Sequence, residues 1–350
     1  MSNNPTAATT LNKDDQIVIT GAGGFIAGGL TRYFHDQGFT RIRAVDKKPL
    51  YKWYQRVPGV ESLCLDVSDY DNCVRAVEGA REVYNLAADM GGMGFIEHFR
   101  IECLRSVLIN TNLIEAAYRA GVERYFFSSS ACAYNTDLQQ DPNVRALKES
   151  DAYPAMAERG YGWEKLVSEM FCQEYWAERH MKTFIARFHN VYGPYGTWDG
   201  GREKAPAAMC RKVLEAQDSG NYEISIWGDG HQTRSFMYID DCVRGIDMIT
   251  HCDDLIATPI NLGSSELVSI NDLVSVVEGI AGAKLERHYD LDAPKGVAGR
   301  NSDNTFIQQV LGWEPNMPLQ EGMVKTYAWI KQQYADRKAG VPTPAADERG

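Results

Sequence analysis

The sequence lacks paired cysteines, long apolar runs and an excess of positive charge, and each absence excludes a class of protein. Its eight cysteines form no Cys-x-x-Cys pair and no Cys/His ligand spacing, which disfavours a zinc site or a disulfide framework. We therefore expect reduced thiols and no metal site. No apolar run is long enough to cross a bilayer, and no basic-then-apolar leader occupies the first 15 residues. These absences predict a cytoplasmic protein without a membrane partner.

Acidic residues outnumber basic residues by 47 to 36, which gives a net charge of −11. Affinity for nucleic acid comes mainly from clustered Lys and Arg, so we expect no nucleic-acid partner. An anionic ligand would have to be held by a local group of basic side chains. At 350 residues, the chain is long enough for a large core that divides into two units.

Short β-rich runs alternate with helical patterns through the first half of the chain, which is typical of parallel βαβ units. After residue 190, shorter elements lie among Gly- and Pro-bearing loops. We therefore predict an α/β fold, a Rossmann-type doubly wound parallel sheet with a smaller C-terminal α/β domain. The predicted strands are 16–20, 41–45, 62–65, 82–86, 124–128 and 182–187, and the later elements are a strand at 223–227 and helices at 205–216, 240–250 and 270–281.

The predicted large domain spans 14–190 and is completed near 235–262, and the smaller domain takes 191–234 and 263–336. The flanks 1–13 and 337–350 lack hydrophobic periodicity and are predicted to be flexible tails. Open α/β sheets bind ligands at the carboxyl ends of their strands. The residues that follow the predicted strands are therefore the candidates for function.

The first predicted strand leads directly into a glycine turn and the start of a helix. Glycines let the backbone approach a pyrophosphate, and the helix start offers free N–H groups and a positive dipole end. Ala27 replaces the third glycine of the usual pattern and is still small. A glycine turn without a ligand is the alternative for this motif alone. The expected cofactor contacts in it are Gly21, Gly23, Gly24, Phe25 and Ile26.

Asp46 ends the second predicted strand, 25 positions after Gly21. A carboxylate there accepts hydrogen bonds from an adenosine ribose and repels a 2′-phosphate, which favours NAD over NADP. Lys47 and Lys48 either soften this preference or form a solvated surface pair. For Asp66, which follows the third strand, a surface cap is the alternative to adenine contact. Further cofactor contacts are expected at Val67, Leu86, Ala87 and Ala88.

Tyr161 and Lys165 are spaced i, i+4 and therefore share one helix face. A nearby ammonium and the cationic ring of the cofactor are expected to lower the pKa of the Tyr161 phenol, so that it serves as general base toward a substrate hydroxyl. Ser130 is expected to hydrogen-bond the same oxygen. A solvated pair is the alternative for Tyr161 and Lys165 alone, and the upstream nucleotide motif weighs against it.

Cys132 lies two positions after Ser130, inside this expected hydride-transfer site. Ser, Tyr and Lys alone can oxidise an alcohol with a nicotinamide, so an added acid/base thiol suggests that protons on neighbouring carbons are also moved. Neighbouring cations or a helix end can lower the pKa of a thiol, about 8.5 when unperturbed, into the working range. The alternative for Cys132 is a buried small hydrophobe.

With these motifs the chain resembles the extended short-chain dehydrogenase/reductase family, from about residue 16 to about residue 333. Members of that family mostly modify nucleotide sugars. The chain departs from the family pattern at Asn135-Thr136, where Pro is frequent, and at Ala298, where Arg is expected. Four longer strings are similar to the GDP-mannose 3,5-epimerase branch: Ala87-Ala88-Asp89-Met90-Gly91-Gly92-Met93-Gly94-Phe95, Phe188-His189-Asn190-Val191-Tyr192-Gly193-Pro194, Gly200-Gly201-Arg202-Glu203-Lys204-Ala205-Pro206-Ala207-Ala208 and Gly299-Arg300-Asn301-Ser302-Asp303-Asn304.

The resemblance implies NAD as cofactor and GDP-mannose or related GDP-hexoses as substrates. Oxidation at sugar carbon 4 makes a ketone, which acidifies the hydrogens on carbons 3 and 5. The resemblance assigns Cys132 and Lys204 as the acid/base pair that inverts these carbons, giving GDP-L-galactose, or GDP-L-gulose when only carbon 5 is inverted. A surface lysine or a phosphate ligand is the alternative for Lys204.

The resemblance also implies which residues hold the nucleotide sugar. Gly94, Ser130, Ala131 and Cys132 are expected beside the hexose, and the turn 227–230 is expected to aim Arg234 inward, with a simple hairpin as the alternative. The remaining contacts are expected from Asn190, Glu203, Lys204, Lys212, Gln232, Thr233, Arg234 and Arg300.

Two other functions stay open. One is a related nucleotide-sugar 4-epimerase or 4,6-dehydratase, although a dehydratase normally needs an acidic residue where Ala131-Cys132 stands. The other is a catalytically silent NAD-binding scaffold, against which the intact Ser130, Tyr161 and Lys165 weigh. The helices expected around 101–120 and 161–176 carry apolar faces. The resemblance implies that they form a homodimer interface, and covering the sheet is the alternative.

Overall fold

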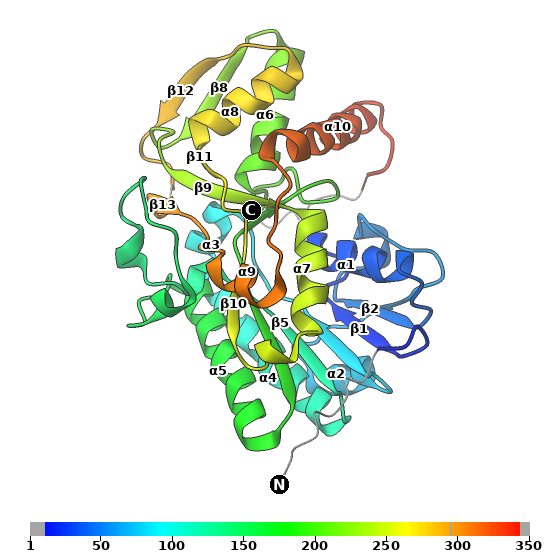
Figure 1. The fold of residues 1–350 in the computed structure, drawn as a ribbon. Helices are drawn as coiled ribbons and strands as arrows, with labels where there is room; N and C mark the ends of the chain where they lie inside the picture. Colours follow the sequence, from blue (N-terminus) through cyan, green and yellow to red (C-terminus); the bar gives the residue numbers. More distant parts are fainter. Residues whose placement is uncertain (1–10, 295, 344–350) are drawn as a thin grey trace.

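The computed structural model describes residues 11–294 and 296–343, and its main sheet confirms the predicted fold class. Seven parallel strands lie in the order β10-β6-β5-β4-β1-β2-β3 (Figure 1). Six of them were predicted, each to within two residues at either end. Their bounds are β1 (Ile17–Thr20), β2 (Ile42–Asp46), β3 (Glu61–Cys64), β4 (Glu82–Asn85), β5 (Arg124–Ser130), β6 (Lys182–Phe188) and β10 (Pro259–Leu262).

Helices cover both faces of this sheet, so its central strands are continuously buried. All residues of β1, β4 and β5 are buried, as expected when a parallel sheet has no solvated face. Alternate residues of these strands pack into two hydrophobic cores, one under α1 and α7 and the other under α2, α4 and α5. The helix bounds are α1 (Phe25–Asp36), α2 (Tyr70–Val77), α4 (Arg100–Arg119), α5 (Tyr161–Arg179) and α7 (Ile239–Thr250).

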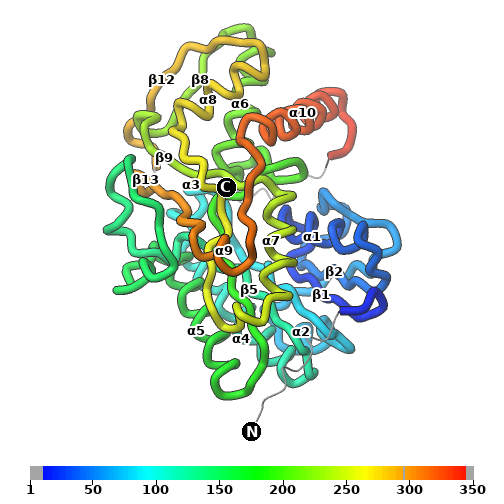
Figure 2. The backbone as a smooth tube through the Cα atoms, viewed as in Figure 1, coloured from blue at the N-terminus to red at the C-terminus, as the bar shows by residue number. Residues whose placement is uncertain are grey.

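A smaller α/β unit lies at the carboxyl ends of the strands, above the large sheet in Figure 2. Its central strand is β9 (Thr233–Tyr238), which pairs with β7 (Asn190–Tyr192), β11 (Leu267–Ser269) and β13 (Gly299–Arg300). A separate parallel pair joins β8 (Glu223–Trp227) to β12 (Glu286–Asp290). The helices α6 (Ala205–Ser219), α8 (Ile270–Ala281) and α10 (Leu319–Lys338) pack against one another.

Short elements connect these units, and local sequence sets several helix ends. Asp69 caps α2 through the backbone N–H of Asn72, and Ser269 with Asp272 forms a capping box for α8. The short elements are α3 (Met93–His98), α9 (Thr305–Leu311), η1 (Leu50–Lys52), η2 (Ala131–Ala133), η3 (Thr136–Gln139), η4 (Glu149–Ala152) and η5 (Asp253–Leu255).

Some elements run across the expected boundaries. β9 spans the boundary expected after residue 234, because it pairs on both edges with strands of the smaller unit. α10 includes Arg337 and Lys338, two residues that we expected in a tail, and Arg337 pairs with Asp199 at 2.5 Å. Residues 1–10 and 344–350 of the expected tails lie outside the described residues. Among the helices that are described, none is long and apolar enough to cross a membrane.

Candidate active site

A cavity of about 590 Å³ lies between the carboxyl ends of the large sheet and the smaller unit. Gly21 and Asp46 line it from the β1 and β2 ends, and Ser130 lines it from the end of β5. Lys204 and Arg234 line it from the smaller unit. This is the position at which open α/β sheets bind their ligands.

The glycine turn forms one wall of the cavity. Gly21 has a φ of 77°, and a Cβ on it would lie 2.8 Å from the carbonyl oxygen of Leu86, so a side chain is excluded there. Gly24 is the N-cap residue of α1 and provides no side-chain cap. The first turn of α1 therefore presents backbone N–H groups to the cavity, and Phe25 and Ile26 line it.

Gly23 supports this wall from behind and does not line the cavity. Its N–H donates to Asp46 Oδ2 at 3.0 Å, and a Cβ on it would lie 2.6 Å from the Trp53 ring nitrogen. The second oxygen of Asp46 accepts from the backbone N–H of Lys48 at 2.8 Å. Burial raises the pKa of Asp46, although these backbone hydrogen bonds act against the rise.

Lys47 and Lys48 both line the cavity, Lys47 as an exposed and Lys48 as a half-buried residue. Lys47 Nζ lies 2.7 Å from Asp89 Oδ2. Asp66 lines the cavity and also closes a turn through the N–H and hydroxyl of Ser68. Burial acts to raise the pKa of Asp66, but the Ser68 hydrogen bonds outweigh it and the pKa is lowered. The cavity wall also includes Val67, Leu86, Ala87 and Ala88.

These features fit a dinucleotide. The turn leaves space beside Gly21, the N-terminus of α1 faces a negative group, and Asp46 has carboxylate lone pairs that can accept from a ribose. The Asp46 carboxylate stabilises this turn through Gly23 and also lies on the cavity wall, where a ribose hydroxyl could donate to it. The residues of this half of the cavity thus suit NAD.

Tyr161 begins α5, and Lys165 lies one turn later on the same face. Tyr161 is 6% and Lys165 1% exposed, and Lys165 Nζ lies 5.4 Å from the Tyr161 ring centroid and 3.6 Å from Glu164 Oε2. Burial, followed by Cys132 and Glu164, raises the pKa of Tyr161 well above its usual value. The expected lowering of this pKa is therefore not produced by the chain's own residues.

Cys132 lies in η2, directly after β5, and is 7% exposed. Ser130 Oγ accepts a hydrogen bond from the backbone N–H of Cys132 at 3.2 Å. Arg300 Nη1 lies 3.4 Å from the Cys132 sulfur. The predicted lowering of the thiol pKa is wrong for this arrangement, because burial and then Glu158 raise the pKa more than Arg300 lowers it.

Lys204 is the N-cap residue of α6 and lines the cavity with Cys132. It is half-buried and is not a surface lysine. Burial lowers its pKa, and the nearby Cys132 and Arg300 act in opposite directions on it. Burial thus favours the neutral form of both Lys204 and Cys132, as it does for any ionisable pair in an apolar site.

Most of the residues expected to hold the sugar and diphosphate lie on the cavity wall. Arg234 is there, and burial followed by the charge of Arg300 lowers its pKa to about 10. An anionic ligand would relieve this repulsion. Thr233 is the exception, because its hydroxyl donates to the carbonyl of Pro142 at 2.5 Å and the residue does not line the cavity. The others on the wall are Gly94, Ala131, Asn190, Glu203, Lys212, Gln232 and Arg300.

The turn 227–230 is not a hairpin. β8 before it pairs with β12, while β9 after it pairs with β7, β11 and β13. Gln232 Nε2 donates to the Trp227 carbonyl at 2.7 Å. The turn therefore carries the chain from one sheet to another and brings Arg234 to the cavity.

Sequence reasoning missed four polar residues of this site, namely Glu158, Gln139, Asp89 and Arg202. Glu158 and Gln139 both contact Arg300, and Asp89 lies between Lys47 and Arg202. Their partners are 42 to 161 positions away in the sequence. Asp89 and Arg202 stand in two of the strings that resemble the epimerase branch, and those strings were the available signal for them.

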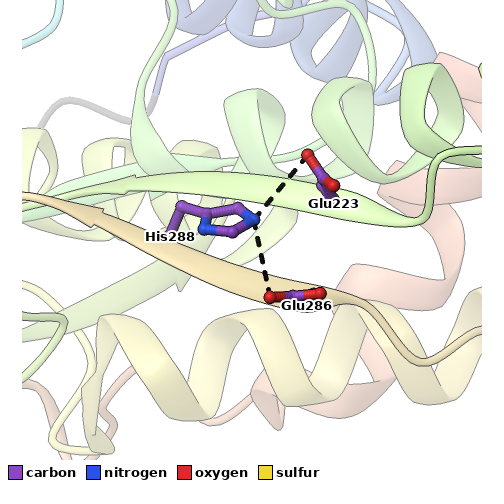
Figure 3. A group of neighbouring side chains, drawn as sticks. All are labelled: Glu223, Glu286 and His288. Carbon is purple, nitrogen blue, oxygen red and sulfur yellow. Dashed lines mark ion pairs between the residues drawn. The ribbon is translucent and has the colours of Figure 1, made fainter.

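A second polar group lies on the outer surface of the smaller unit. His288 on β12 lies between Glu223 on β8 and Glu286, with Nε2 at 3.7 Å and 4.0 Å from their oxygens (Figure 3). One ligand atom of each residue lies within 4.8 Å of the others, and all three residues are exposed. Exposed acidic groups of this kind are common without an ion.

Comparison with known proteins places the chain in a family. The model of the NAD dependent epimerase/dehydratase family matches residues 17–263. The curated GDP-mannose 3,5-epimerase of Arabidopsis thaliana is 45% identical over 325 residues, which cover 93% of this chain and 84% of the relative. GDP-mannose 3,5-epimerase 1 of Oryza sativa subsp. japonica is 44% identical, over 92% of this chain and 83% of that relative.

Solved structures share the fold. The UDP-glucose 4-epimerase of Thermus thermophilus, solved with NAD, aligns with a TM-score of 0.76 at 20% identity, over 90% of this chain and 99% of that one. At this identity the likeness concerns the fold alone. The family match and the two plant relatives carry the assignment further: this chain belongs to the NAD dependent epimerase/dehydratase family.

Proposed function

We propose that this enzyme is a GDP-mannose 3,5-epimerase. It converts GDP-mannose to GDP-L-galactose and, when only carbon 5 is inverted, to GDP-L-gulose. The observation that carries this proposal is the placement of Cys132 and Lys204 in one cavity with Ser130, Tyr161 and Lys165. Hydride transfer at carbon 4 needs only the last three. The identity with the Arabidopsis epimerase supports the same function.

NAD binding is assigned to the large unit. Gly21, Gly24 and the start of α1 receive the pyrophosphate, and Asp46 accepts from the adenosine ribose. Gly23 acts indirectly by orienting Asp46. NAD bound there would supply reversible hydride transfer at carbon 4 and a positive charge beside Tyr161. The remaining contacts are proposed for Phe25, Ile26, Asp66, Val67, Leu86, Ala87 and Ala88.

Tyr161 Oη is proposed to take the proton of the carbon-4 hydroxyl and to return it at the end. Its burial keeps the phenol protonated until positive charge lies beside it. Lys165 lies nearby, with its Nζ 5.4 Å from the ring centroid, but the pKa of Tyr161 is raised with Lys165 in place, so we propose that the positive ring of bound NAD completes the lowering. Ser130, which ends β5 and lines the cavity, is proposed to hydrogen-bond the same sugar oxygen.

Cys132 and Lys204 are proposed to move the protons on carbons 5 and 3. A ketone at carbon 4 makes both carbon–hydrogen bonds acidic, so a base on one face and an acid on the other invert each carbon. Cys132 comes from the large unit and Lys204 from the smaller one, so that they approach the sugar from different walls of the cavity. After each inversion, the base has taken one proton from the sugar carbon and the acid has given one proton to it.

The smaller domain, proposed as 191–234 with 263–336 and extended by β9 to Tyr238 and by α10 to Lys338, holds the nucleotide sugar. Arg234 is proposed to bind the diphosphate, because its guanidinium brings positive charge to the cavity wall and already faces a second cation. Thr233 contributes by holding the β9 backbone and not by direct contact. The proposed contacts are Gly94, Ala131, Asn190, Glu203, Lys212, Gln232 and Arg300.

We also propose that the enzyme is a homodimer in the cytoplasm. Large apolar side chains stay exposed along α4 and α5, with Ile101 70% and Met170 50% exposed. Exposed apolar surface shared by two adjacent helices is typical of an interface. The eight cysteines are all free, which suits a reducing compartment. The other apolar residues of this face are Leu104, Leu108, Trp163, Val167 and Phe171.

Product analysis tests the function. Purified enzyme is incubated with GDP-mannose, and the sugar signals are followed by proton NMR. New L-galactose and L-gulose signals are the expected result. A 4-keto-6-deoxy sugar would instead identify a dehydratase, and inversion at carbon 4 would identify a 4-epimerase. No change with any nucleotide sugar would leave a non-catalytic NAD-binding scaffold.

A further inference from the structure

One carboxylate next to the proposed acid/base thiol has no role in the steps above. Glu158 precedes α5, and its backbone N–H donates to the carbonyl oxygen of Cys132 at 3.1 Å. Its side chain is 12% exposed and forms an ion pair with Arg300 Nη2 at 2.5 Å. Glu158 is therefore tied to Cys132 through the backbone and to Arg300 through its carboxylate.

Arg300 connects this carboxylate to the sulfur. Its Nε donates to Gln139 Oε1 at 2.6 Å, and its Nη1 lies 3.4 Å from Cys132 Sγ. A guanidinium is planar and rigid, so fixing Nε and Nη2 also fixes the direction of Nη1. Glu158 and Gln139 thus hold Arg300 in the orientation that directs its Nη1 at the thiol.

Titratable and charged groups face Cys132 from several elements. Glu158 is the carboxylate among them, and its charge acts against a negative charge on the Cys132 sulfur. Burial is the largest cause that raises the pKa of Cys132, Glu158 is the next, and Arg300 opposes both. The groups are Cys103 on α4, Glu158 before α5, Tyr161 on α5, Lys204 before α6, Arg234 on β9 and Arg300 on β13.

We propose that Glu158 is a positioning residue of the epimerase: it holds Arg300 against Cys132, places a negative charge beside the thiol, and so sets the pH range in which Cys132 exchanges a proton. The inference rests on the acid/base role proposed for Cys132. It adds a residue that does not touch the sugar and acts through the thiol and Arg300.

Glu158→Gln tests the proposal, because the amide oxygen still accepts from Arg300 while the charge is lost. Removing a contacting negative charge stabilises the thiolate, and one unit of fall in pKa raises the thiolate fraction about tenfold below the pKa. Iodoacetamide should therefore alkylate Cys132 about tenfold faster in this variant near neutral pH. The rate is read for the Cys132 peptide by mass spectrometry, since the protein has eight free thiols.

Asp137→Asn is the matched control, because Asp137 is exposed on η3 and its loss changes the net charge equally. In Asp137→Asn, Cys132 should be alkylated at the same rate as in the unmodified enzyme at every pH. The rate of Cys132 alkylation is measured as a function of pH. A folded Glu158→Gln variant in which this pH dependence is unshifted overturns the proposal. A purely structural role for Glu158 would lower stability without moving this pH dependence.

Arg300→Gln is a second test, which also serves when Glu158→Gln does not fold. Its expected effect on the rate of Cys132 alkylation has the opposite sign. Loss of the cation should raise the pKa of Cys132 and slow its alkylation, and an equal or faster rate overturns the proposal. These rates are measured without sugar. A failure of the unmodified enzyme to convert GDP-mannose would therefore refute the proposed function separately.

Discussion

Gly162 lies where α5 packs against η2, the short helix that carries Cys132. A Cβ added to Gly162 overlaps the carbonyl oxygen of Cys132 and lies 3.0 Å from the carbonyl carbon and 3.2 Å from Glu158 Cβ. Ordinary contact begins at 3.4 Å, so in Gly162→Ala one of the two backbones must move by roughly 1 Å or more. Tyr161 lies on one of these backbones and Cys132 on the other.

Gly162→Ala should change the stability and the catalytic rate to different extents. Overpacking costs about 1–3 kcal/mol, and the higher helix propensity of Ala returns about 1 kcal/mol. The net loss of unfolding free energy is therefore about 2 kcal/mol at most. A displacement of about 1 Å between catalytic groups can cost about a hundredfold in rate. We expect activity to fall much further than stability.

Denaturant unfolding and the rate of GDP-mannose conversion measure the two effects. Gly279→Ala in α8 is the control, because a Cβ there meets nothing within 4 Å. It should stabilise the protein by up to about 1 kcal/mol and leave the rate unchanged. A folded Gly162→Ala enzyme that works at the original rate would refute the account of how α5 and η2 are held together.

Three further predictions follow from single residues. Asp46→Ala should weaken NAD binding by about 10- to 100-fold and reduce its preference over NADP, as read by titration of both cofactors. Burial acts to lower the pKa of His251, but Asp247 and Glu82 outweigh it and raise the pKa to about 10. His251→Gln should therefore cost unfolding free energy below about pH 6.5, with the difference lost as the pH rises through about 10 in denaturant titrations. Met170→Glu on α5 should shift the sedimentation of the enzyme to that of a monomer, and an unchanged coefficient would count against the proposed interface.

The sequence predicted the parts of the fold that depend on local pattern. Six strands of the main sheet were found because buried parallel strands are short apolar runs between helical segments. β10 (Pro259–Leu262) was missed as a strand because it begins at Pro259, and a proline in an apolar run counts against a strand. The region 235–262 was nonetheless expected to complete the large domain, and β10 adds to the large sheet next to β6.

Within the site, the sequence identified residues by spacing but could not give their electrostatics. The glycine turn and the Tyr161–Lys165 pair follow from local patterns. Glu158 and Arg300 are 142 positions apart and meet only in the folded chain. Without Glu158 and without burial, a lowered pKa for Cys132 was the natural expectation, and both act in the opposite direction.

The central claim is that Cys132 moves protons on the sugar carbons next to a transient ketone. Deuterium entry at carbons 3 and 5 of GDP-mannose in D₂O, compared between the enzyme and Cys132→Ser with NAD bound to both, tests it most directly. We expect label at both carbons with the enzyme and a loss of exchange by about 10²- to 10⁴-fold in the variant, with NAD binding retained. Exchange at the original rate in Cys132→Ser would contradict it.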